Sequence, residues 1–403
     1  MLKWNKLSWR LYFLDLAKGL KTKDYLRIFQ SSFDWSYNEV REYQNNKLRE
    51  LVEHAYNNTV YYKTIFDENG ITPADIRTVD DLGKIPVLDR EDFIDNYSNL
   101  IDKKNRYAIQ FPSSSSGTTG TPLKYIHDKD GESAGIAGGY ALYNLSGWWP
   151  GDRTLHIWGN PASIKKWNTF FSKAKRKLLN QINYPAFLLN NPENYPHLLE
   201  LIYSQKPYYI DGYASSIGSF AAWLAKKNKK IDGIKAVFTT AENLTQVNKE
   251  NIEKYIGPVS DLYGCGEING IAIQPINHEE YYVLDTHVIV ETVEINGIKE
   301  LVVTDLDNRI MPFIRYKIGD TVDGIYAGSA KRGLHFSRFK KLEGRISDYI
   351  QLPSGKIIHP VTLLGGTFLR SFPSIKRHKV IWNGSKMRFL LESNEYVDIQ
   401  RLK

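Results

Sequence analysis

One stretch of the chain, residues 113–122, has residue types and spacing that could bind a phosphate group. It reads Ser-Ser-Ser-Ser-Gly-Thr-Thr-Gly-Thr-Pro. Glycines let the backbone come close to a ligand and direct its N–H groups at it, while Ser and Thr hydroxyls add donors that suit phosphate oxygens. A nucleotide triphosphate is the natural ligand of such a loop. A flexible surface linker is the alternative that the same composition allows.

The residues on either side of this stretch favour a ligand loop over a linker. Residues 107–111 and 123–126 have the pattern of short strands, which predicts a hairpin with the loop at its tip. The loop is not a Walker A sequence, because Gly120 is followed by Thr121 and Pro122 and not by Lys and Ser or Thr.

Composition bounds the class of protein. With 403 residues, 42% of them hydrophobic and 13% aromatic, the chain can build a large core in two or three domains. A single cysteine leaves no disulfide framework and no cysteine metal site, and it fits a reducing cytoplasm. We expect no signal peptide and no membrane span, because charged residues interrupt the apolar residues of 1–20 and no apolar run is long enough elsewhere.

The net charge of +8 is compatible with anionic ligands or a membrane surface and specifies neither. No recognisable nucleic-acid module accompanies the basic clusters, so we expect no nucleic-acid partner.

Residues 1–100 have helical periodicity, with predicted helices over 7–29 and 37–56. The first helix is amphipathic and could lie on a membrane. Packing on the body of the protein is the interpretation that we favour.

Beyond residue 130 the strand and helix signals alternate. A helix rich in small residues is predicted over 131–145, strands over 154–158, 208–211, 234–239 and 259–262, and helices over 194–204, 215–227 and 246–255. This order predicts a layered α/β protein with a largely parallel sheet. Strand signals dominate from 281 to 341, which indicates a smaller antiparallel or barrel-like unit, and two more strands are predicted at 379–382 and 387–392.

The phosphate-loop candidate resembles the Ser-Ser-Gly-Thr-Thr-Gly-x-Pro loop of adenylate-forming enzymes. Four further stretches agree with that superfamily in order and spacing. Ala-Glu at 241–242 resembles its Gly-Glu segment beside adenine, and Tyr-Gly-Cys-Gly-Glu at 263–267 resembles its Tyr-Gly-x-Thr/Ser-Glu motif. Arg-Tyr-Lys-Ile-Gly-Asp at 315–320 resembles Arg-Tyr-Arg-Thr-Gly-Asp, and Gly-Arg-Ile-Ser-Asp at 344–348 resembles a Gly-Arg-x-x-Asp hinge. Each motif alone is a weak signal, but five in order are a strong one.

Within the adenylate-forming, acyl-CoA synthetase-like superfamily, the chain is most similar to the phenylacetate-CoA ligase branch and its CapK-like relatives of capsular polysaccharide biosynthesis. The similarity is carried by residues 48–62, 66–70, 81–82, 85–87 and 210–215, and it covers about residues 40–360. It implies an α/β fold: a large multi-sheet adenylate-forming body, with a helical part at 1–100, the rest at 101–344 and a β-barrel-like subdomain at about 281–341. A short, hinged α+β C-terminal domain is expected at 345–403.

The resemblance implies an ATP-dependent ligase that joins a carboxylate to AMP and passes the acyl group to coenzyme A or another acceptor, with Mg²⁺ as cofactor. It implies catalytic roles for Thr118, Thr119, Glu267 and Arg345, with Glu267 also contacting the metal because hard cations take carboxylate oxygens. It implies nucleotide binding by Ser115, Ser116, Gly117, Thr118, Thr119, Gly120, Ala241, Glu242, Tyr263, Gly264, Asp320 and Arg345.

Four of these residues have a plain structural alternative. Glu267 could be a solvated or salt-bridged loop carboxylate, and Asp320, the expected acceptor of ribose hydroxyls, could be an ordinary turn residue. Tyr263, expected to stack on adenine, could be a strand-end aromatic. Arg345, expected to hold ribose or phosphate, could form a salt bridge at the hinge.

The chain departs from the family pattern in three places. Gly266 stands where the motif has Thr or Ser, Leu123 follows Pro122, and the tail after the hinge is short, with no recognisable catalytic lysine. Two other functions therefore stay open: a degenerate nucleotide-binding or scaffold protein of a polysaccharide assembly system, and an enzyme that adenylylates a cofactor or a sugar-linked acceptor. The expected partners are ATP and a small carboxylic acid, and a homodimer is a further possibility.

Overall fold

The computed structural model describes residues 2–104, 107, 109–115, 123–159, 169–295, 297–328, 334–345, 350–351, 357–358, 375–382 and 386–393. The chain divides into two compact units. The large unit comprises Met1–Ile318 and Val322–Leu342, and the small unit comprises Gly319–Thr321 and Glu343–Lys403.

The large unit begins with α-helices and short 3-10 helices: α1 (Leu2–Lys18), α2 (Thr22–Ser31), η1 (Ser32–Asp34), α3 (Tyr37–Asn58), α4 (Val60–Glu68), η2 (Pro73–Asp75), η3 (Val79–Lys84), α5 (Arg90–Asp95) and α6 (Tyr97–Leu100). The helical segment predicted over 7–29 is confirmed, and it consists of two helices. Gly19 separates them, because its φ of +67° ends α1. The predicted helix over 37–56 is confirmed as α3, whose first turn is closed by reciprocal hydrogen bonds between Ser36 and Glu39.

The hairpin predicted around the phosphate loop is confirmed. β1 (Gln110–Ser114) pairs antiparallel with β2 (Lys124–Asp128), and α7 (Lys129–Asn144) follows at once. β1 lies about three residues later than predicted and contains Pro112. A two-stranded hairpin has a free edge on each strand, so it tolerates a residue without a backbone N–H.

The main sheet of the large unit has the order β13-β9-β8-β7-β6-β5-β3-β4. Its strands are β3 (Thr154–Trp158), β4 (Gln181–Pro185), β5 (Tyr209–Tyr213), β6 (Ala236–Thr240), β7 (Val259–Tyr263), β8 (Ala272–Gln274), β9 (Tyr281–Val283) and β13 (Arg338–Phe339). Strands β4, β3, β5, β6 and β7 are parallel to one another, and the remaining neighbours pair antiparallel. The predicted largely parallel α/β sheet is therefore confirmed.

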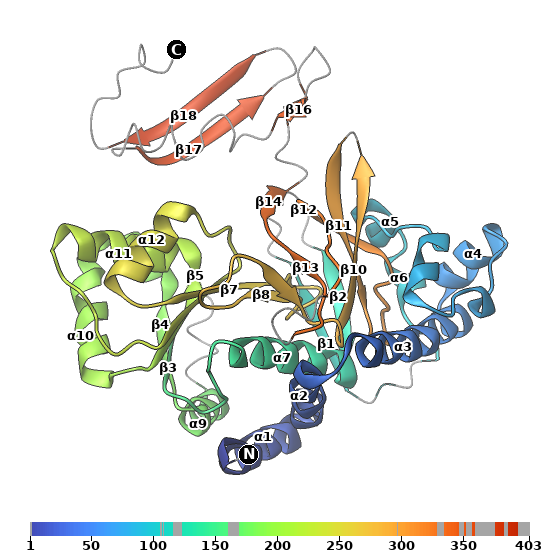
Figure 1. The fold of residues 1–403 in the computed structure, drawn as a ribbon, viewed down its shortest axis with the longest axis horizontal. Helices are drawn as coiled ribbons and strands as arrows, with labels where there is room; N and C mark the ends of the chain where they lie inside the picture. The colour runs from blue at the N-terminus through green and yellow to red at the C-terminus, as the bar shows by residue number, and fades with distance from the viewer. Residues whose placement is uncertain are drawn as a thin grey trace. The chain divides into compact units, whose positions relative to one another are not determined.

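The helices between the parallel strands are α9 (Phe170–Leu179), η4 (Ala186–Asn190), η5 (Pro192–Asn194), α10 (Tyr195–Gln205), α11 (Ala214–Lys226) and α12 (Gln246–Tyr255). α10, α11 and α12 share a core with Leu155, Ile210 and Val237 on one face of the sheet. On the other face, Tyr143 of α7 stacks on Phe238 with ring centroids 3.9 Å apart. Figure 1 shows α10–α12 gathered beside β3–β7 and α7 running below the strands, so helices cover both faces.

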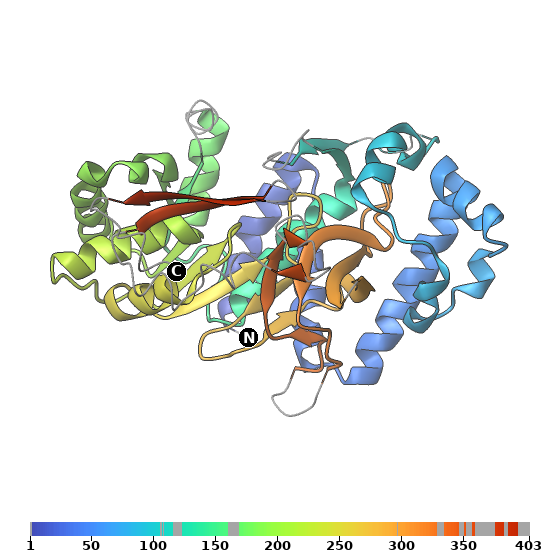
Figure 2. The same cartoon turned by 90° about the horizontal axis from the view of Figure 1, so that it is seen from above.

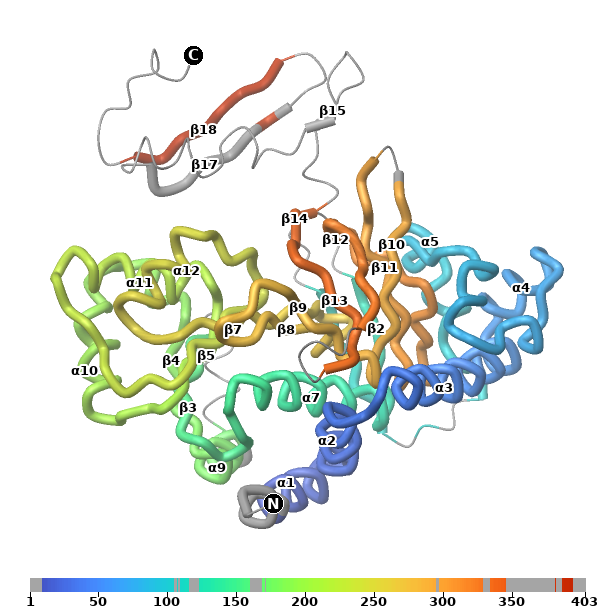
Figure 3. Tube along the Cα trace, in the orientation of Figure 1, coloured from blue at the N-terminus to red at the C-terminus, as the bar shows by residue number. Residues whose placement is uncertain are grey.

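The strand-rich region predicted at 281–341 contributes to two sheets. β9 and β13 extend the main sheet, while β10 (Val288–Ile295), β11 (Ile298–Asp305) and β12 (Tyr316–Val322) are neighbours in a second sheet. β10 and β11 form a long hairpin, visible in Figure 3.

The N-terminal helices share a core with the second sheet. Phe93 of α5 stacks on Phe313, with ring centroids 5.3 Å apart. Figure 2 shows the blue helices α3 and α4 at one end of the large unit and the green and yellow helices α10–α12 at the other.

The small unit includes parts of β12 and β14 (Leu342–Arg345), together with β15 (Ile350–Gln351), β16 (Ile357–Ile358), β17 (Ile375–Trp382) and β18 (Met387–Ser393). β15 pairs with β16 and β17 pairs with β18, both antiparallel. The two strands predicted at 379–382 and 387–392 are confirmed, and the first begins four residues earlier than predicted. Among the described helices of the whole chain, none combines the length and the apolar character needed to cross a bilayer.

Asp128 is the residue whose replacement we expect to loosen this fold most directly. Its carboxylate is buried and accepts hydrogen bonds from the backbone N–H groups of Gly131, Arg309 and Ile310 at 2.8, 2.8 and 3.0 Å. Asp128→Ala removes the N-cap of α7 and leaves two other N–H groups without an acceptor, so we expect a loss of roughly 2–4 kcal/mol of unfolding free energy in urea denaturation.

Thr245→Ala is the matched control, because Thr245 caps α12 through one exposed hydrogen bond. Its loss should be about 1 kcal/mol. Equal losses for the two variants would contradict the role given to Asp128.

Candidate functional site

The base of the phosphate loop is closed by its own backbone and one hydroxyl. Ser115 donates its N–H to Leu123 O at 2.8 Å, and Ser115 Oγ accepts from Leu123 N at 2.9 Å. The predicted binding residues Ser116, Gly117, Thr118, Thr119 and Gly120 lie outside the described residues. Ser115 therefore helps to fix the shape of the loop at its base.

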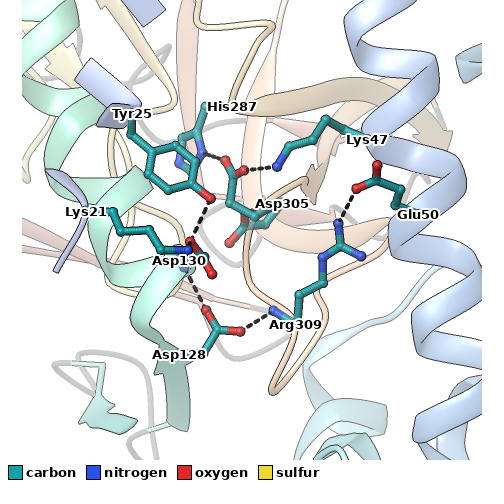
Figure 4. Close-up of polar contacts among 11 residues, drawn as sticks. Lys21, Tyr25, Lys47, Glu50, Asp128, Asp130, His287, Asp305 and Arg309 are labelled. Atoms are coloured by element: carbon teal, nitrogen blue, oxygen red, sulfur yellow. Dashed lines mark hydrogen bonds and ion pairs between the residues drawn. The ribbon is translucent and has the colours of Figure 1, made fainter. Parts of the chain in front are cut away.

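Behind the loop, the chain is fastened to the turn between β11 and β12. Asn308 Oδ1 accepts from Asp128 N at 3.1 Å, and Asn308 Nδ2 donates to Ile126 O at 3.0 Å. Arg309 forms an ion pair with Glu50 of α3 at 3.1 Å, as Figure 4 shows. The strand that leaves the loop is thus held to a turn about 180 residues away in sequence.

A buried charged cluster lies beside this turn. Asp307 contacts Lys47 Nζ through Oδ1 at 2.7 Å and His287 Nδ1 through Oδ2 at 2.8 Å, and Asp305 Oδ1 accepts from Asp307 N. Burial alone would raise the pKa of Asp307, but Lys47 and His287 outweigh that effect and lower it. Figure 4 shows Lys47 and His287 approaching from different elements.

This cluster gathers His287, Asp305 and Asp307 with ligand atoms within 4.8 Å of one another, an arrangement that could hold a metal ion. Lys47 already supplies a cation at Asp307. We therefore interpret the cluster as a charge-compensated link between α3 and the second sheet. Sequence reasoning missed it, because its members are distant in sequence and share no motif.

Glu267 lies in the loop after β7 and is buried, with 6% exposure. Its backbone O is 2.8 Å from His127 Nε2 on β2. Within the described part of the chain its carboxylate forms no ion pair, so the salt-bridged alternative has no support there. A carboxylate oxygen is a ligand that suits a bound hard cation such as Mg²⁺.

His127 connects the two candidate motifs. Burial would lower the pKa of His127, but the hydrogen bonds to the Glu132 carboxylate and to Glu267 O outweigh burial and raise it. Nε2 of His127 donates to the Glu267 backbone O, because a carbonyl oxygen can only accept. His127 therefore fixes the Glu267 backbone to the strand that leaves the phosphate loop.

Tyr263 and Ala241 lie side by side. Strands β6 and β7 are parallel with Thr239 opposite Asp261, so residues 241 and 263 emerge together at the carboxyl edge of the sheet. Tyr263 is 8% exposed and meets Phe339 edge to face at 5.8 Å. Gly264 begins the turn that leads to Glu267, and a Cβ there would meet Gly270 N at 3.0 Å.

Ala241 has a φ of +65°, in the left-handed region that favours glycine. The next residue, Glu242, accepts a hydrogen bond from Ser215 N at 2.9 Å in the first turn of α11. The Glu242 carboxylate therefore joins the loops that follow β5 and β6. It also places negative charge at a helix N-terminus, where the helix dipole favours it.

In the small unit, Asp320 and Arg345 form a pair. Arg345 Nε is 3.2 Å from Asp320 Oδ1, and the Arg345 side chain is 46% exposed. Asp320 lies within β12 and not in a turn. The salt-bridge alternative for Arg345 is therefore observed, and the pair presents a carboxylate and a partly exposed guanidinium together. The hinge residues 346–348 lie outside the described residues.

Arg315, the first residue of the third motif, has a structural role in the large unit. Its backbone φ is +53°, and its guanidinium lies 3.2 Å from Glu291 Oε2 and 2.5 Å from Ile85 O. It therefore links β10 to the segment after η3.

His156, which no sequence motif singles out, belongs to a largely buried pair with Asp211. His156 Nδ1 lies 2.5 Å from Asp211 Oδ1 across the adjacent strands β3 and β5, and Nε2 is buried with no hydrogen-bond partner among the described residues. The rings of Trp158 and Tyr213 lie next to the pair along the same strands, 4.8 Å apart. β3 and β5 flank the point where the strand order reverses, which is where α/β sheets bind ligands. The pair could have been found from the sequence only by predicting the register in which β3 and β5 pair, which places His156 opposite Asp211.

Comparison with known proteins bears on this site. No protein-family model matches the chain. The chain is 26% identical over 331 residues to protein CapK of Staphylococcus aureus, covering 81% of this chain and 72% of that protein. It is 24% identical over 349 residues to a phenylacetate-coenzyme A ligase of Aromatoleum evansii, covering 78% and 72%. The resemblance inferred from the motifs is confirmed.

Among solved structures, a 2-hydroxyisobutyryl-CoA ligase with a bound acyl-AMP superposes with a TM-score of 0.65 at 16% identity, covering 87% of this chain and 78% of that one. ATP-bound MatB from Rhodopseudomonas palustris superposes with a TM-score of 0.52 at 13% identity, covering 72% and 59%. These likenesses confirm the expected α/β fold of adenylate-forming enzymes.

Ala241→Gly tests the strain beside the candidate nucleotide site. A left-handed conformation costs an L-residue roughly 1 kcal/mol, and glycine avoids most of that cost, so we expect the variant to gain about 0.5–1 kcal/mol of unfolding free energy. Asn180→Gly is the control. Asn180 also has a positive φ, at the end of α9, but asparagine tolerates it and the change should be near neutral. Destabilisation by Ala241→Gly in urea denaturation would contradict the strain.

Proposed function

We propose that this chain, whose sequence is related to CapK and the phenylacetate-CoA ligases and whose fold is that of adenylate-forming enzymes, is an ATP-dependent, AMP-forming acid ligase. One observation carries the proposal. His127, on the strand that leaves the phosphate loop, holds the backbone of the buried Glu267 at 2.8 Å. Two motifs that are distant in sequence thereby meet in one unit.

The proposed reaction has two steps. A carboxylate oxygen of the acid attacks the α-phosphorus of ATP, an O–P bond forms, and the bond to the β-phosphate breaks as pyrophosphate leaves. A thiol sulfur, such as that of coenzyme A, then attacks the acyl carbon and AMP leaves. The first step needs negative charge to be neutralised on the polyphosphate.

The chain's residues have separate proposed roles. The loop residues Ser115 to Gly120, with Thr118 and Thr119 at its centre, donate hydrogen bonds to phosphate oxygens. Glu267 binds Mg²⁺, which supplies charge neutralisation when it is present.

Residues near the sheet edge and in the small unit would bind the rest of the nucleotide. Ala241, Glu242, Tyr263 and Gly264 line the adenine side. Asp320 accepts ribose hydroxyls, and Arg345 holds ribose or phosphate.

We further propose that residues 345–403 form a small domain that turns about a hinge near Asp348, so that one site serves both half-reactions. No lysine is assigned to the first step. The proposed substrate is a small carboxylic acid, and the proposed location is the cytoplasm, where ATP and a reduced cysteine are found together. A role in polysaccharide biosynthesis is part of the proposal, because the motif resemblance includes the CapK-like relatives of capsular polysaccharide biosynthesis.

The ligase reaction can be tested with MgATP, hydroxylamine and a broad panel of carboxylic acids. We expect pyrophosphate release and a hydroxamate product with at least one acid. Glu267→Gln removes the charge that holds the metal and should lower the rate roughly tenfold or more. Glu253→Gln, on the exposed side of α12, is the matched control and should leave the rate unchanged.

Other outcomes identify the alternative functions. Nucleotide binding in calorimetry without pyrophosphate release from any acid would favour a degenerate nucleotide-binding or scaffold protein. A product whose mass includes AMP attached to a cofactor or sugar-linked acceptor would favour the adenylylating enzyme. Absence of both binding and turnover would contradict the proposal.

The N-terminal helix suggests where the enzyme acts. Trp9, Tyr12, Phe13 and Leu16 of α1 follow an i, i+3, i+4, i+7 spacing and are 48, 54, 54 and 69% exposed, while Leu11 on the opposite side is 2% exposed. One face of α1 therefore packs on the body, as expected, and the other is an uncovered apolar stripe. Trp and Tyr favour the membrane interface, and basic residues beside the stripe suit anionic lipid.

We propose peripheral membrane contact through this stripe, and vesicle sedimentation tests it. Binding to vesicles that contain phosphatidylserine should fall severalfold in Trp9→Ser/Phe13→Ser and should weaken with added salt. Tyr203→Ser/Tyr208→Ser, which removes two equally exposed aromatic side chains elsewhere, is the control. A concentration-dependent dimer that the stripe variant abolishes, with no vesicle binding, would instead assign the stripe to a homodimer.

A further inference from the structure

The place of the missing motif hydroxyl is occupied by another residue. The motif at residues 263–267 has glycine at 266 where the related motif has Thr or Ser. A Cβ built on Gly266 would lie 2.8 Å from Tyr125 Oη, 3.6 Å from Cζ and 3.8 Å from Cε1. The Tyr125 hydroxyl therefore stands where a side chain at 266 would begin. A serine or threonine there would clash with it.

Tyr125 is held firmly in this position. It lies on β2 and is 4% exposed, and its ring packs against that of His127 with centroids 5.3 Å apart. Ser113, directly opposite on β1, hydrogen-bonds the hydroxyl. The phenol thus reaches from the strand that leaves the phosphate loop to the turn that carries Glu267.

The Tyr125 hydroxyl has the protonation state that a serine or threonine hydroxyl would have. Burial is the largest effect that raises the pKa of Tyr125 to about 12, and the nearby Glu267 carboxylate adds to it. At neutral pH the group is therefore an uncharged O–H, able both to donate and to accept. A serine or threonine hydroxyl has the same capacity.

We propose that the Tyr125 hydroxyl supplies, from β2, the hydroxyl that a Thr or Ser of the motif would supply from position 266. It acts as a donor beside Glu267, toward the metal-bound triphosphate. This inference rests on the proposed function, because it assigns the ligand to MgATP. Tyr125 and Gly266 then form a compensating pair, in which the glycine makes room for the phenol.

A rescue experiment tests the proposal. Tyr125→Phe removes only the hydroxyl and should weaken MgATP binding, measured by calorimetry without any acid, by roughly 10- to 100-fold. Tyr125→Phe/Gly266→Ser should restore binding to within about threefold of the original protein, since the serine hydroxyl enters the space that the phenol oxygen leaves. Gly266→Ser alone should lower the Tm, because its Cβ meets the phenol oxygen.

Tyr195→Phe is the matched control. Tyr195 is buried and donates its hydroxyl to Leu189 O on α10's side of the sheet, away from both motifs. Loss of the Tyr195 hydroxyl should leave the affinity for MgATP unchanged.

The outcomes separate this inference from the ligase proposal. MgATP binding without pyrophosphate release from any acid would defeat the ligase proposal, while the affinities of the four variants would still decide the role of Tyr125. Unchanged affinity in Tyr125→Phe, or no recovery in the double variant although both proteins are folded by circular dichroism, would overturn the inference. Absence of MgATP binding by the original protein would overturn both.

Discussion

The Asp128 carboxylate is the interaction on which the candidate site depends. It ends the strand that leaves the phosphate loop, begins α7 and holds the turn that follows β11, all through backbone N–H donors. Burial raises the pKa of Asp128, and these hydrogen bonds oppose that effect. A buried carboxylate is tolerated only where such donors surround it. The strand that leaves the phosphate loop, α7 and the turn after β11 are therefore held together by one side chain.

Two ion pairs hold helix α3 to the turn after β11. Lys47 of α3 contacts Asp307, and Glu50 of α3 contacts Arg309 on the same turn. The Lys47–Asp307 contact is buried and the Glu50–Arg309 contact is partly exposed. The buried pair therefore has the larger desolvation cost and the stricter requirement for good geometry. A buried ion pair adds little net stability, but losing either partner leaves a charge without compensation. Such a pair defines one arrangement of α3 against the second sheet.

The loop after β7 is also closely packed against β2. Gly266 leaves room for the Tyr125 hydroxyl, and His127 holds the backbone of Glu267 from the same strand. Ala241, directly after the neighbouring strand β6, keeps a left-handed backbone without the glycine that would relieve it. Strained backbone of this kind persists where surrounding contacts fix it, and it is common at functional sites.

Sequence by itself determined the parallel α/β order, the loop at the tip of a hairpin and the five motifs, because hydrophobic periodicity and local residue types carry that information. It missed the break at Gly19, since a single glycine within an amphipathic run gives little warning. Only the tertiary structure decided that Arg315 is a structural link, that His156 meets Asp211 and that Tyr125 fills the space at Gly266. The physical reason is that each of these contacts joins residues on different strands or segments, and their side chains meet only after the sheet has fixed the register.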